Sequence, residues 1–344
     1  MASPAAQRFA DGGPRVIVAG ATGFTGALAA YLLWRHPDFE LTAVTGRSEL
    51  GRPLREVYPR YRVPLEIEPL EVERLAGIDA AVVAYPHAAA APTVGALRER
   101  GIRVVDLSAD FRLRSLAAYE RWYGEHPRPD LLDEAVYGLT ELHRERIAGA
   151  AIVANPGCYP TASLLALAPL ARAGLIADVV IDAKQGISGA GRVFDETTHL
   201  SMAGENIVPY KVAAHRHTPE IEEQLALLGA GEMKVQFQAH LVPLDQGEMA
   251  SCYVTTTRPV AAEELRDMYT AAYAEEPFVE LLDGPPGVLE VRETNYCRVF
   301  AAADQHTGKV IAFGAIDNLW KGTSSQAVQN LNLMFGLPET RGLL

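Results

Sequence analysis

The sequence predicts an α/β protein in which a doubly wound parallel sheet is joined to a second α+β domain with a mostly antiparallel sheet. Strand and helix signals alternate over the first half, whereas closely spaced strand signals dominate the second half. The chain has 344 residues, which is more than one core of ordinary size requires. The predicted parts are an N-terminal tail over 1–14, a first domain over 15–155 plus 317–344, and a second domain over 156–316.

Apolar runs separated by helical segments predict the strands of the first domain. Arg15–Gly20 is a short apolar run that ends in glycine, and the helical pattern of Thr25–Trp34 stops at His36-Pro37. Because strands that alternate with helices form βαβ units, we expect a parallel sheet. The remaining elements expected here are strands over 40–45, 78–85 and 102–107 and a helix over 88–100.

The second half opens with a helical pattern over 158–173 and then changes character. The short distances between its strand signals favour antiparallel pairing. Helical periodicity returns over 321–335. The strands expected here cover 179–184, 233–244, 249–257, 296–303 and 309–316.

Composition and charge exclude several classes of protein. Apolar residues make up 49% and charged residues 22%, which excludes a disordered chain. The net charge of -12 argues against nucleic acid or an anionic membrane as partner, so local positive groups must hold any anionic ligand. The opening segment has no apolar signal-peptide core and no stretch is apolar enough to span a membrane, so we expect a cytoplasmic protein. Three widely spaced cysteines argue against a disulfide framework or zinc site, and we expect no metal.

A glycine-rich turn directly follows the first predicted strand and opens the first helix. Glycines at this position allow a tight turn, a close approach of the backbone to a pyrophosphate, and close packing of the helix. The turn therefore predicts a Rossmann-type dinucleotide site. Its residues are Gly20, Thr22, Gly23, Phe24, Thr25 and Gly26.

The segment after the second strand favours NADP over NAD. NAD-selective domains place an acidic residue there to bind the ribose 2′-hydroxyl, whereas this chain has Thr45-Gly46-Arg47-Ser48. Arg47 and Ser48 suit a 2′-phosphate. Pro86 and His87 follow another strand end and are expected to line the cofactor cleft.

Cys158 is the candidate nucleophile. It follows Asn155-Pro156-Gly157 at a strand-to-helix junction, and Pro160 suits the first turn of a helix. The amino end of a helix lowers the pKa of a thiol, so we expect a reactive thiolate. Cys252 and Cys297 lie in strand-like runs and are expected to be buried apolar residues.

Two histidines are candidate acid–base catalysts for this thiol. His215 and His217 stand at a spacing of two, just before a helix with Thr218 as the expected N-cap and Pro219 at its first position. The residues alone leave open which histidine moves the proton. Arg112 lies beyond a predicted strand end, where doubly wound sheets bind ligands, and is a candidate for binding phosphate.

A nicotinamide cofactor together with an activated cysteine suggests interconversion of an aldehyde and an acyl derivative through a thioester. The motifs that carry this chemistry resemble those of the N-acetyl-γ-glutamyl-phosphate reductase family, within the aspartate-semialdehyde dehydrogenase-like superfamily. The resemblance rests on 20–26, 108–112, 155–161, 188–192, 215–221 and 315–322.

The resemblance implies NADPH-dependent reduction of N-acetyl-γ-glutamyl phosphate to the γ-semialdehyde, with phosphate released from a Cys158 thioester. It favours His217 over His215 as proton donor, because His217 adjoins the helix start. It also implies that the C-terminal helix returns to the first domain and that the second sheet forms the contact of a homo-oligomer, a dimer or tetramer. The remaining residues that it implies are Ser188, Gly189 and Asn318 near the cofactor, and Arg112, Asn155, Tyr210 and Lys211 near the substrate.

One departure from the family pattern affects the cofactor site, because Ala88 follows Pro86-His87 where glycine is usual. Two other functions remain open. A related reductase of lysine biosynthesis acts on phosphorylated aminoadipate held on a carrier protein, and a non-catalytic NADP-binding regulator would keep the glycine turn without needing Cys158.

Overall fold

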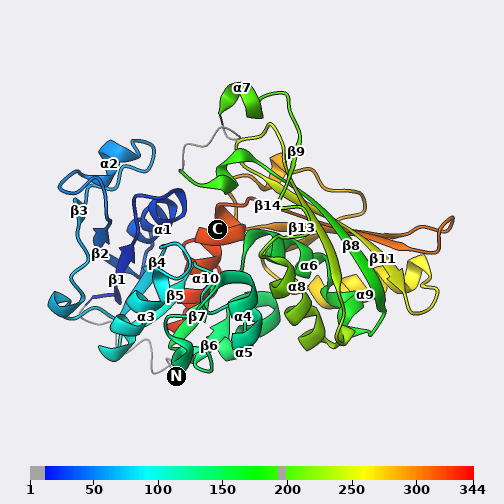
Figure 1. The fold of residues 1–344 in the computed structure, drawn as a ribbon, viewed down its shortest axis with the longest axis horizontal. Coiled ribbons are helices and arrows are strands. Elements are labelled where there is room, and N and C mark those ends of the chain that lie inside the picture. Colours follow the sequence, from blue (N-terminus) through cyan, green and yellow to red (C-terminus); the bar gives the residue numbers. More distant parts are fainter. Residues whose placement is uncertain (1–11, 193–198) are drawn as a thin grey trace. The chain divides into compact units, whose positions relative to one another are not determined.

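The computed structural model describes residues 12–192 and 199–344, and its contacts divide the chain into two compact units (Figure 1). The first unit comprises the residues up to Pro156 together with Thr323–Leu344, and the second comprises Gly157–Gly322. Residues 1–11 of the predicted N-terminal tail lie outside the described residues.

The first unit contains a seven-stranded sheet in the order β3-β2-β1-β4-β5-β7-β6, and each described pairing is parallel. Its strands are β1 (Arg15–Ala19), β2 (Glu40–Thr45), β3 (Ile67–Glu68), β4 (Ala80–Val83), β5 (Arg103–Asp106), β6 (Ala135–Tyr137) and β7 (Ile152–Ala154). Its α-helices are α1 (Phe24–Trp34), α2 (Leu54–Val57), α3 (Ala90–Glu99), α4 (Leu116–Tyr123), α5 (Thr140–Ile147) and α10 (Ser325–Met334).

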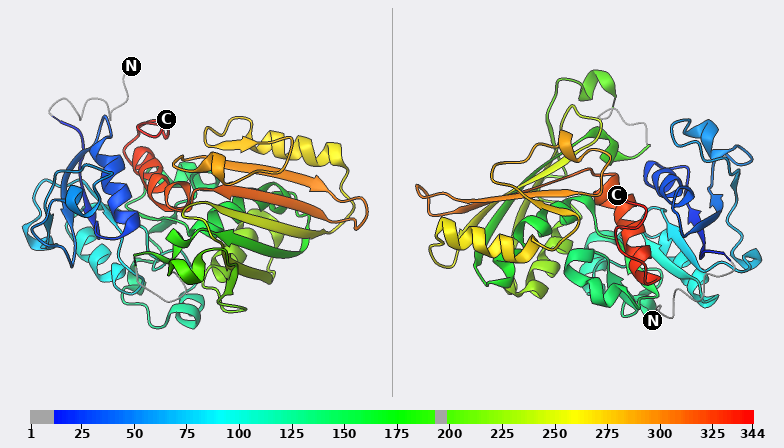
Figure 2. Two further views of the ribbon diagram at one scale, coloured as in Figure 1. Left: turned by 90° about the horizontal axis from the view of Figure 1, so that it is seen from above. Right: turned by 180° about the vertical axis from the view of Figure 1, so that it is seen from behind.

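Helices cover both faces of this sheet because its central strands are apolar on both sides. Ile17 and Ala19 of β1 pack in one core cluster with Val94 and Leu97 of α3. The alternate residue Val18 is buried too. Helix α1 lies beside α10, and both views of Figure 2 show this pair in blue and red. The C-terminal helix therefore belongs to the first unit.

The second unit contains a mixed seven-stranded sheet in the order β12-β13-β14-β11-β8-β10-β9. The β8/β10 and β12/β13 pairings are parallel, and the other described pairings are antiparallel. Its strands are β8 (Ile176–Gln185), β9 (Val208–Tyr210), β10 (Val235–Leu241), β11 (Glu248–Thr256), β12 (Val279–Leu281), β13 (Cys297–Ala303) and β14 (Val310–Ile316). Its α-helices are α6 (Cys158–Arg172), α7 (Leu200–Ala203), α8 (Thr218–Leu225) and α9 (Ala262–Tyr273).

Helix α6 is the central helix of the second unit. It packs against β11, β13 and β14, and α8 and α9 lie beside it. Two tyrosines of α9, Tyr269 and Tyr273, donate hydrogen bonds to the carbonyls of Ala166 and Leu165 in α6. The sheet and its neighbours thus fix the first residue of α6, which is Cys158.

The predicted fold class is confirmed: a doubly wound parallel sheet is followed by a mixed sheet with mostly antiparallel pairing. One local prediction was wrong. Helix α8 begins at Thr218 with His217 as its N-cap residue, so Thr218 is not the cap. Cys252 and Cys297 are buried in β11 and β13, as their apolar surroundings predict.

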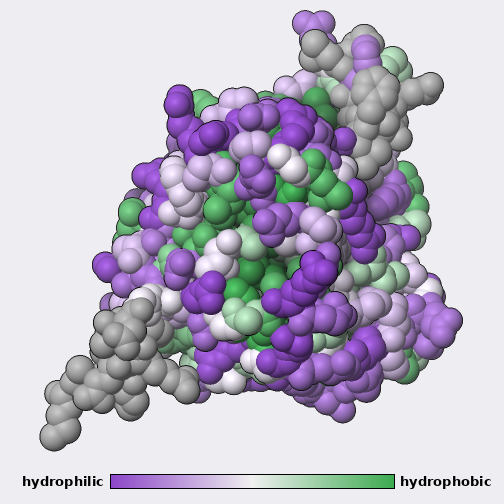
Figure 3. Space-filling model, turned by 90° about the vertical axis from the view of Figure 1, so that its left-hand side faces the viewer, coloured by the Kyte–Doolittle hydropathy of each residue, from purple (hydrophilic) through white to green (hydrophobic). Residues whose placement is uncertain are grey.

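Polar residues predominate on one face of the molecule. On the face drawn in Figure 3, hydrophilic residues in purple surround a smaller group of apolar residues in green. Among the described residues, no helix is long and apolar enough to traverse a bilayer.

Candidate active site

The glycine turn of the first unit has the geometry that a dinucleotide site requires. Gly20 has a φ of +92°, and a Cβ on it would lie 2.6 Å from the carbonyl oxygen of Ala84. A Cβ on Gly26 would lie 2.2 Å from the carbonyl oxygen of Gly20, so only glycine lets α1 pack this closely. At Gly23, the N-cap residue of α1, a Cβ would find its nearest neighbour 3.8 Å away. The turn is tight at both ends and open in its middle, where a pyrophosphate would meet the first N–H groups of α1.

Arg47 and Ser48 are exposed directly after β2, as predicted. The guanidinium of Arg47 stacks over the ring of Tyr85, with its carbon 4.8 Å from the ring centre. The backbone N–H groups of Gly20 and Ala21 both donate to the carbonyl of Thr45 at 2.9 Å. The end of β2 is therefore joined to the glycine turn, and Arg47 lies beside that junction.

The segment that follows β4 contains Pro86 and His87 and then turns at Ala88. His87 is half-buried and contacts the ring of Tyr123 edge to face, with 5.5 Å between ring centres. Ala88 has a φ of +63°, a conformation that strains an alanine. Asp110 holds this strained turn, because its carboxylate accepts the N–H groups of Ala88 at 2.7 Å and Ala91 at 2.9 Å.

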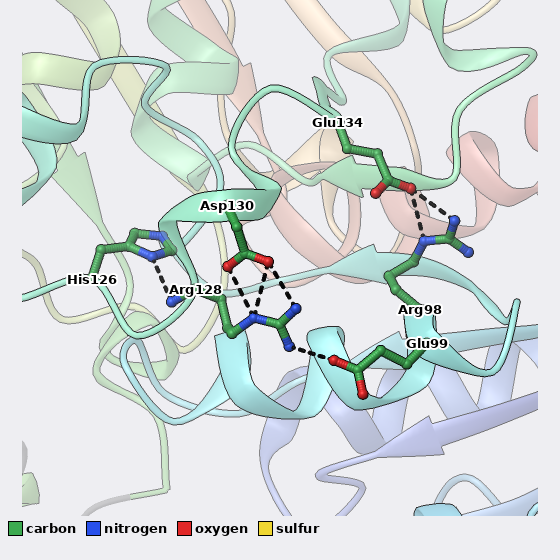
Figure 4. Close-up of polar contacts among 6 residues, drawn as sticks. All are labelled: Arg98, Glu99, His126, Arg128, Asp130 and Glu134. Carbon is green, nitrogen blue, oxygen red and sulfur yellow. Dashed lines mark hydrogen bonds and ion pairs between the residues drawn. The ribbon is translucent and has the colours of Figure 1, made fainter.

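Asp110 is itself fixed by its surroundings. Tyr119 donates its hydroxyl to the Asp110 carboxylate at 2.7 Å, and Nε2–H of His126 donates to the Asp110 carbonyl at 2.6 Å. Figure 4 shows how the chain beyond His126 is held on α3. In that cluster Arg128 binds Asp130 and Glu99, and Arg98 binds Glu134.

Arg112 and Asn155 lie together at the carboxyl ends of β5 and β7. Arg112 is buried, with Nε donating to the carbonyl of Asn155 at 2.8 Å and Nη2 donating to that of Leu107 at 2.9 Å. The amide of Asn155 donates to the carbonyl of Thr323 at 3.0 Å and accepts from Asn330 at 3.1 Å. These contacts tie the strand ends to the C-terminal segment.

In the second unit, Cys158 is the first residue of α6 and is half-buried. Its N-cap residue, Gly157, donates its N–H to the carboxylate of Glu220 at 2.9 Å. Glu220 is buried in the first turn of α8, directly after the histidine segment. The fold therefore brings the cysteine motif and the histidine motif together.

One side chain donates a hydrogen bond to the sulfur of Cys158, and a carboxyl acts on it electrostatically. Gln185, the last residue of β8, donates its amide N–H to Sγ at 3.1 Å. The carboxyl of Glu248, at the start of β11, is the charged group that acts on this sulfur. A Cβ on Gly189 would lie 2.3 Å from the Gln185 side chain, so this glycine leaves room for Gln185.

The electrostatics of the free thiol differ from the sequence expectation. Enclosure of the sulfur, followed by the negative charge of Glu248, raises the pKa of Cys158 well above its usual range. The expected lowering of the thiol pKa at a helix amino end was therefore wrong. The hydrogen bonds from Gln185 and from the backbone of Tyr159 act in the lowering direction but are smaller effects.

The two histidines lie against Tyr159, the residue after Cys158. The ring centre of Tyr159 is 5.4 Å from that of His215 and 5.8 Å from that of His217. Burial, with a smaller effect of the Lys211 charge, lowers the pKa of His215 to about 3. Its Nδ1 accepts the backbone N–H of His217 at 3.1 Å. His215 is thus a neutral, buried ring, whereas His217 is half-buried.

Tyr210 and Lys211 adjoin the same aromatic group. The hydroxyls of Tyr159 and Tyr210 are 3.0 Å apart, and the rings of Tyr210 and His215 are 5.6 Å apart. Lys211 is exposed, and burial of part of its side chain together with the charge of Arg216 lowers its pKa. A cation and a phenol therefore lie near the histidines, where they suit an anionic substrate.

Ser188, Gly189 and Asn318 lie in one hydrogen-bonded group of loops. The hydroxyl of Ser188 donates to the carbonyl of Asp245 at 2.6 Å, and the amide of Asn318 donates to that hydroxyl at 3.1 Å. Asn318 also accepts the N–H of Gly247 at 2.9 Å. This group supports the segment between Gln185 and Glu248.

Gln185 and Glu248 are the site residues that the sequence reasoning missed. Gln185 directly precedes the glycine-rich loop 186–192, and that position is a signal that could have found it. Glu248 directly precedes the strand predicted over 249–257, and a charged residue at that position is expected to be exposed. Among the described residues, no group of His, Cys, Asp or Glu is arranged to hold a metal ion.

Comparison with known proteins gives the family. Residues 15–150 match the family described as "Semialdehyde dehydrogenase, NAD binding domain", and residues 158–318 match "Semialdehyde dehydrogenase, dimerisation domain". The N-acetyl-gamma-glutamyl-phosphate reductase of Moorella thermoacetica is 48% identical over 336 residues, covering 95% of this chain and 96% of that protein. The protein of the same name from Desulforudis audaxviator is 48% identical over 343 residues, covering 96% and 98%.

The chain belongs to the N-acetyl-gamma-glutamyl-phosphate reductase family. The resemblance inferred from the motifs is thereby confirmed, and the chain is an oxidoreductase with a domain that binds a nicotinamide cofactor.

Solved structures support the fold of this family member. Aspartate semialdehyde dehydrogenase II of Vibrio cholerae, complexed with ASA, superposes with a TM-score of 0.72 at 20% identity, covering 94% of this chain and 98% of that chain. The Candida albicans aspartate semialdehyde dehydrogenase with NADP gives a TM-score of 0.68 at 16% identity, covering 94% and 98%. At these identities the likeness establishes the shared fold.

Proposed function

We propose that this chain reduces N-acetyl-γ-glutamyl phosphate to N-acetylglutamate γ-semialdehyde with NADPH and releases phosphate. The observation that carries the proposal is Cys158 at the start of α6, bound by Gln185 and joined to the histidine segment through Glu220. Relatives 48% identical over nearly their whole length carry the name of this reductase.

Cys158 is the proposed nucleophile. Its sulfur attacks the acyl carbon of the phosphorylated substrate, the bond to phosphate breaks, and a thioester forms. The N–H groups at the start of α6 favour negative charge near that sulfur. Bound nicotinamide supplies the hydride that reduces the acyl group.

His217 is the proposed proton carrier for the substrate oxygen. It donates a proton as the oxygen gains charge and takes it back as the aldehyde carbonyl forms. His215 is neutral because burial lowers its pKa to about 3, and its Nδ1 is occupied by the His217 backbone N–H. We assign His215 to fixing the segment and His217 to the chemistry.

The substrate carries negative charge, and four residues are proposed to hold it. Lys211 and Tyr210 offer a cation and a hydroxyl close to His215. Arg112 and Asn155, tied to each other at the strand ends of the first unit, are proposed to order the loops that meet the substrate phosphate. Lys211 is proposed to bind the substrate but not to transfer a proton. Substitutions at Lys211 should therefore raise KM more than they lower kcat.

NADP is the proposed form of the cofactor. Arg47 and Ser48 are exposed after β2, where the ribose 2′ group falls in such domains, and segment 45–48 has no carboxylate. The open backbone at Gly23 and the loop residues Ser188, Gly189 and Asn318 complete the proposed cofactor set.

A titration tests the cofactor proposal. Arg47→Ala should weaken NADPH binding about tenfold or more, because an arginine–phosphate contact is lost, and should leave NADH binding nearly unchanged. The exposed Arg55→Ala is the matched control and should alter neither. Tighter binding of NADH than NADPH by the unaltered protein would contradict the assignment.

Two further proposals concern the domain boundaries and the oligomeric state of the protein. We propose that 15–155 plus 317–344 bind the dinucleotide and that 156–316 carry catalysis and the contact between subunits of a cytoplasmic dimer or tetramer. The match of residues 158–318 to a dimerisation domain supports a homo-oligomer. Light scattering on the purified protein gives its mass; a monomer at all concentrations would contradict the oligomer.

The function is tested by phosphate-dependent reduction of NADP with N-acetylglutamate semialdehyde, compared with the aspartate and aminoadipate semialdehydes. We expect the first substrate to be preferred. Preference for the aminoadipate compound would favour the lysine-pathway reaction, and no turnover of any of them would favour a non-catalytic regulator. Cys158→Ala should reduce turnover well over a hundredfold, while Cys252→Ala, which alters a distant buried thiol, should not.

A further inference from the structure

Glu248 is a buried acidic residue to which the proposed function gives no role. Its side chain is 0% exposed at the start of β11. In the sheet it lies directly opposite Gln185 of β8 on one side and Ile316 of β14 on the other. Residues directly opposite each other in a sheet point to the same face, so Glu248 and Gln185 both point toward the start of α6.

The hydrogen bonding of Glu248 is unusual for a buried carboxylate. Both of its oxygens are buried, and neither has a hydrogen-bond partner among the described residues. The thiol of Cys158 is an ionisable group close enough to act on this carboxyl electrostatically. A buried carboxyl without hydrogen-bond partners destabilises a fold in either protonation state, so a structural role does not explain this residue.

A role in binding the substrate does not explain it either. An acyl phosphate is an anion, and Glu248 in its ionised form repels it. A role as acceptor of the thiol proton is consistent with both points. The transfer moves the negative charge from the carboxylate to the sulfur, so no further charge is buried.

We propose that Glu248 is the general base that takes the proton of Cys158, while the Gln185 amide holds the sulfur in place. This inference rests on the proposed function. The S–H bond breaks and an O–H bond forms on Glu248. The sulfur electron pair bonds to the acyl carbon, and phosphate leaves with the pair from its broken bond and takes a proton from solvent. When the aldehyde departs, the proton on Glu248 returns to sulfur.

The electrostatics around Glu248 suit this exchange. Burial, and to a lesser degree the neighbouring charge of Asp317, raise its pKa to about 8, close to a working pH. The other ionisable groups around it are Cys158 and the phenols of Tyr159 and Tyr210, whose pKa values lie above their usual range. The acid is therefore poised to gain and lose a proton while the phenols stay neutral.

The test uses Glu248→Gln in the full-length protein with two measurements. Turnover should fall about a hundredfold or more, because the base is lost. Alkylation of Cys158 by iodoacetamide without substrate should move in the opposite sense, with its pH midpoint shifted to lower pH, because the negative neighbour is gone. Glu248→Asp should recover about a tenth or more of the lost rate.

The matched control is Glu280→Gln, which alters a carboxylate of β12 that pairs with Arg298 at 2.6 Å. It should change neither measurement. Wild-type turnover in Glu248→Gln, an unmoved alkylation midpoint, or a Glu248→Asp protein as slow as Glu248→Gln would overturn the inference. Inert wild-type protein would instead overturn the proposed function, and the alkylation profile would still test the Glu248–Cys158 pair.

Discussion

At the scale of single residues, the fold treats two neighbouring histidines differently. His215 is 5% exposed, and burial lowers its pKa to about 3. His217 is half-buried and is the N-cap residue of α8. A proton carrier must change charge near neutral pH, which His215 does not do. Sequence spacing placed the histidines together but could not rank them, because both burial and the Nδ1 contact depend on distant residues.

We therefore expect His217→Gln to lower kcat about a hundredfold, through loss of acid–base catalysis, while the protein stays folded. His215→Gln should mainly lower the melting temperature, because it disturbs a buried aromatic group. Steady-state kinetics and thermal unfolding of both variants give the comparison. If His215→Gln lost more kcat than His217→Gln with an unchanged melting temperature, the two roles would have to be exchanged.

Two glycines of the dinucleotide turn also differ. Gly23→Ala should fold normally, because its Cβ would meet nothing closer than 3.8 Å, but it should weaken NADPH binding by occupying the space above the turn. Gly20→Ala should destabilise the fold by about 1–2 kcal/mol or more, because of its positive φ and the Ala84 carbonyl. Cofactor titration and thermal melts distinguish them; equal melting temperatures would refute the assigned difference.

At the scale of elements, the turn before α3 contains a residue with a strained backbone conformation. Ala88 takes a left-handed conformation and is held there by the Asp110 carboxylate. Glycine would take this conformation without strain. The sequence departure at this position, alanine for the usual glycine, is therefore explained as a tolerated strain.

Ala88→Gly should consequently raise stability, by up to about 1 kcal/mol, since relief of strain is partly offset by a more flexible unfolded chain. Chemical denaturation measures it, and Ala89→Gly, at a residue with a φ of -90°, is the matched control and should destabilise. A loss of stability in Ala88→Gly would mean that the turn is not strained.

Most elements predicted from sequence were long and periodic, although the 12-residue helix α9 was missed. Helices α1, α3 and α6 and strands β8, β11 and β14 repeat apolar residues over enough positions to be recognised. The missed strands β3, β6, β9 and β12 are two or three residues long. Such strands exist because neighbouring strands supply hydrogen bonds, which no local pattern encodes.

At the scale of the whole molecule, buried acids make stability depend on pH. Burial raises the pKa of Asp106, at the end of β5, to about 7 despite hydrogen bonds from Ser108. A carboxyl whose pKa is higher in the folded state binds its proton more tightly there than in the unfolded chain. The contribution of Asp106 to the free energy of unfolding is most favourable below about pH 4 and is lost as the pH rises toward 7.

Asp106→Asn should flatten this part of the stability profile, because an amide resembles the protonated acid and does not titrate. The free energy of unfolding measured from pH 4 to 8 should fall less steeply than in the wild type, whereas the exposed Asp133→Asn should leave the slope unchanged. An unchanged slope in Asp106→Asn would show that this acid is not the source.

The candidate site was predictable where chemistry resides in short motifs. The glycine turn, Cys158 and the histidine segment each stand at an element boundary that local rules recognise. Gln185 had one local signal, its position before the glycine-rich loop 186–192. Glu248 had none, because it comes near Cys158 only through pairing of β8 with β11 and packing of α6 on that sheet.

The central claim is that Cys158 carries the acyl group, and the most direct measurement is intact-protein mass after mixing with N-acetyl-γ-glutamyl phosphate without NADPH. We predict release of one phosphate per active site and a mass increase equal to one N-acetylglutamyl group, located on Cys158 and absent in Cys158→Ala. Turnover by wild-type protein with no such adduct, or an adduct that persists in Cys158→Ala, would contradict the account.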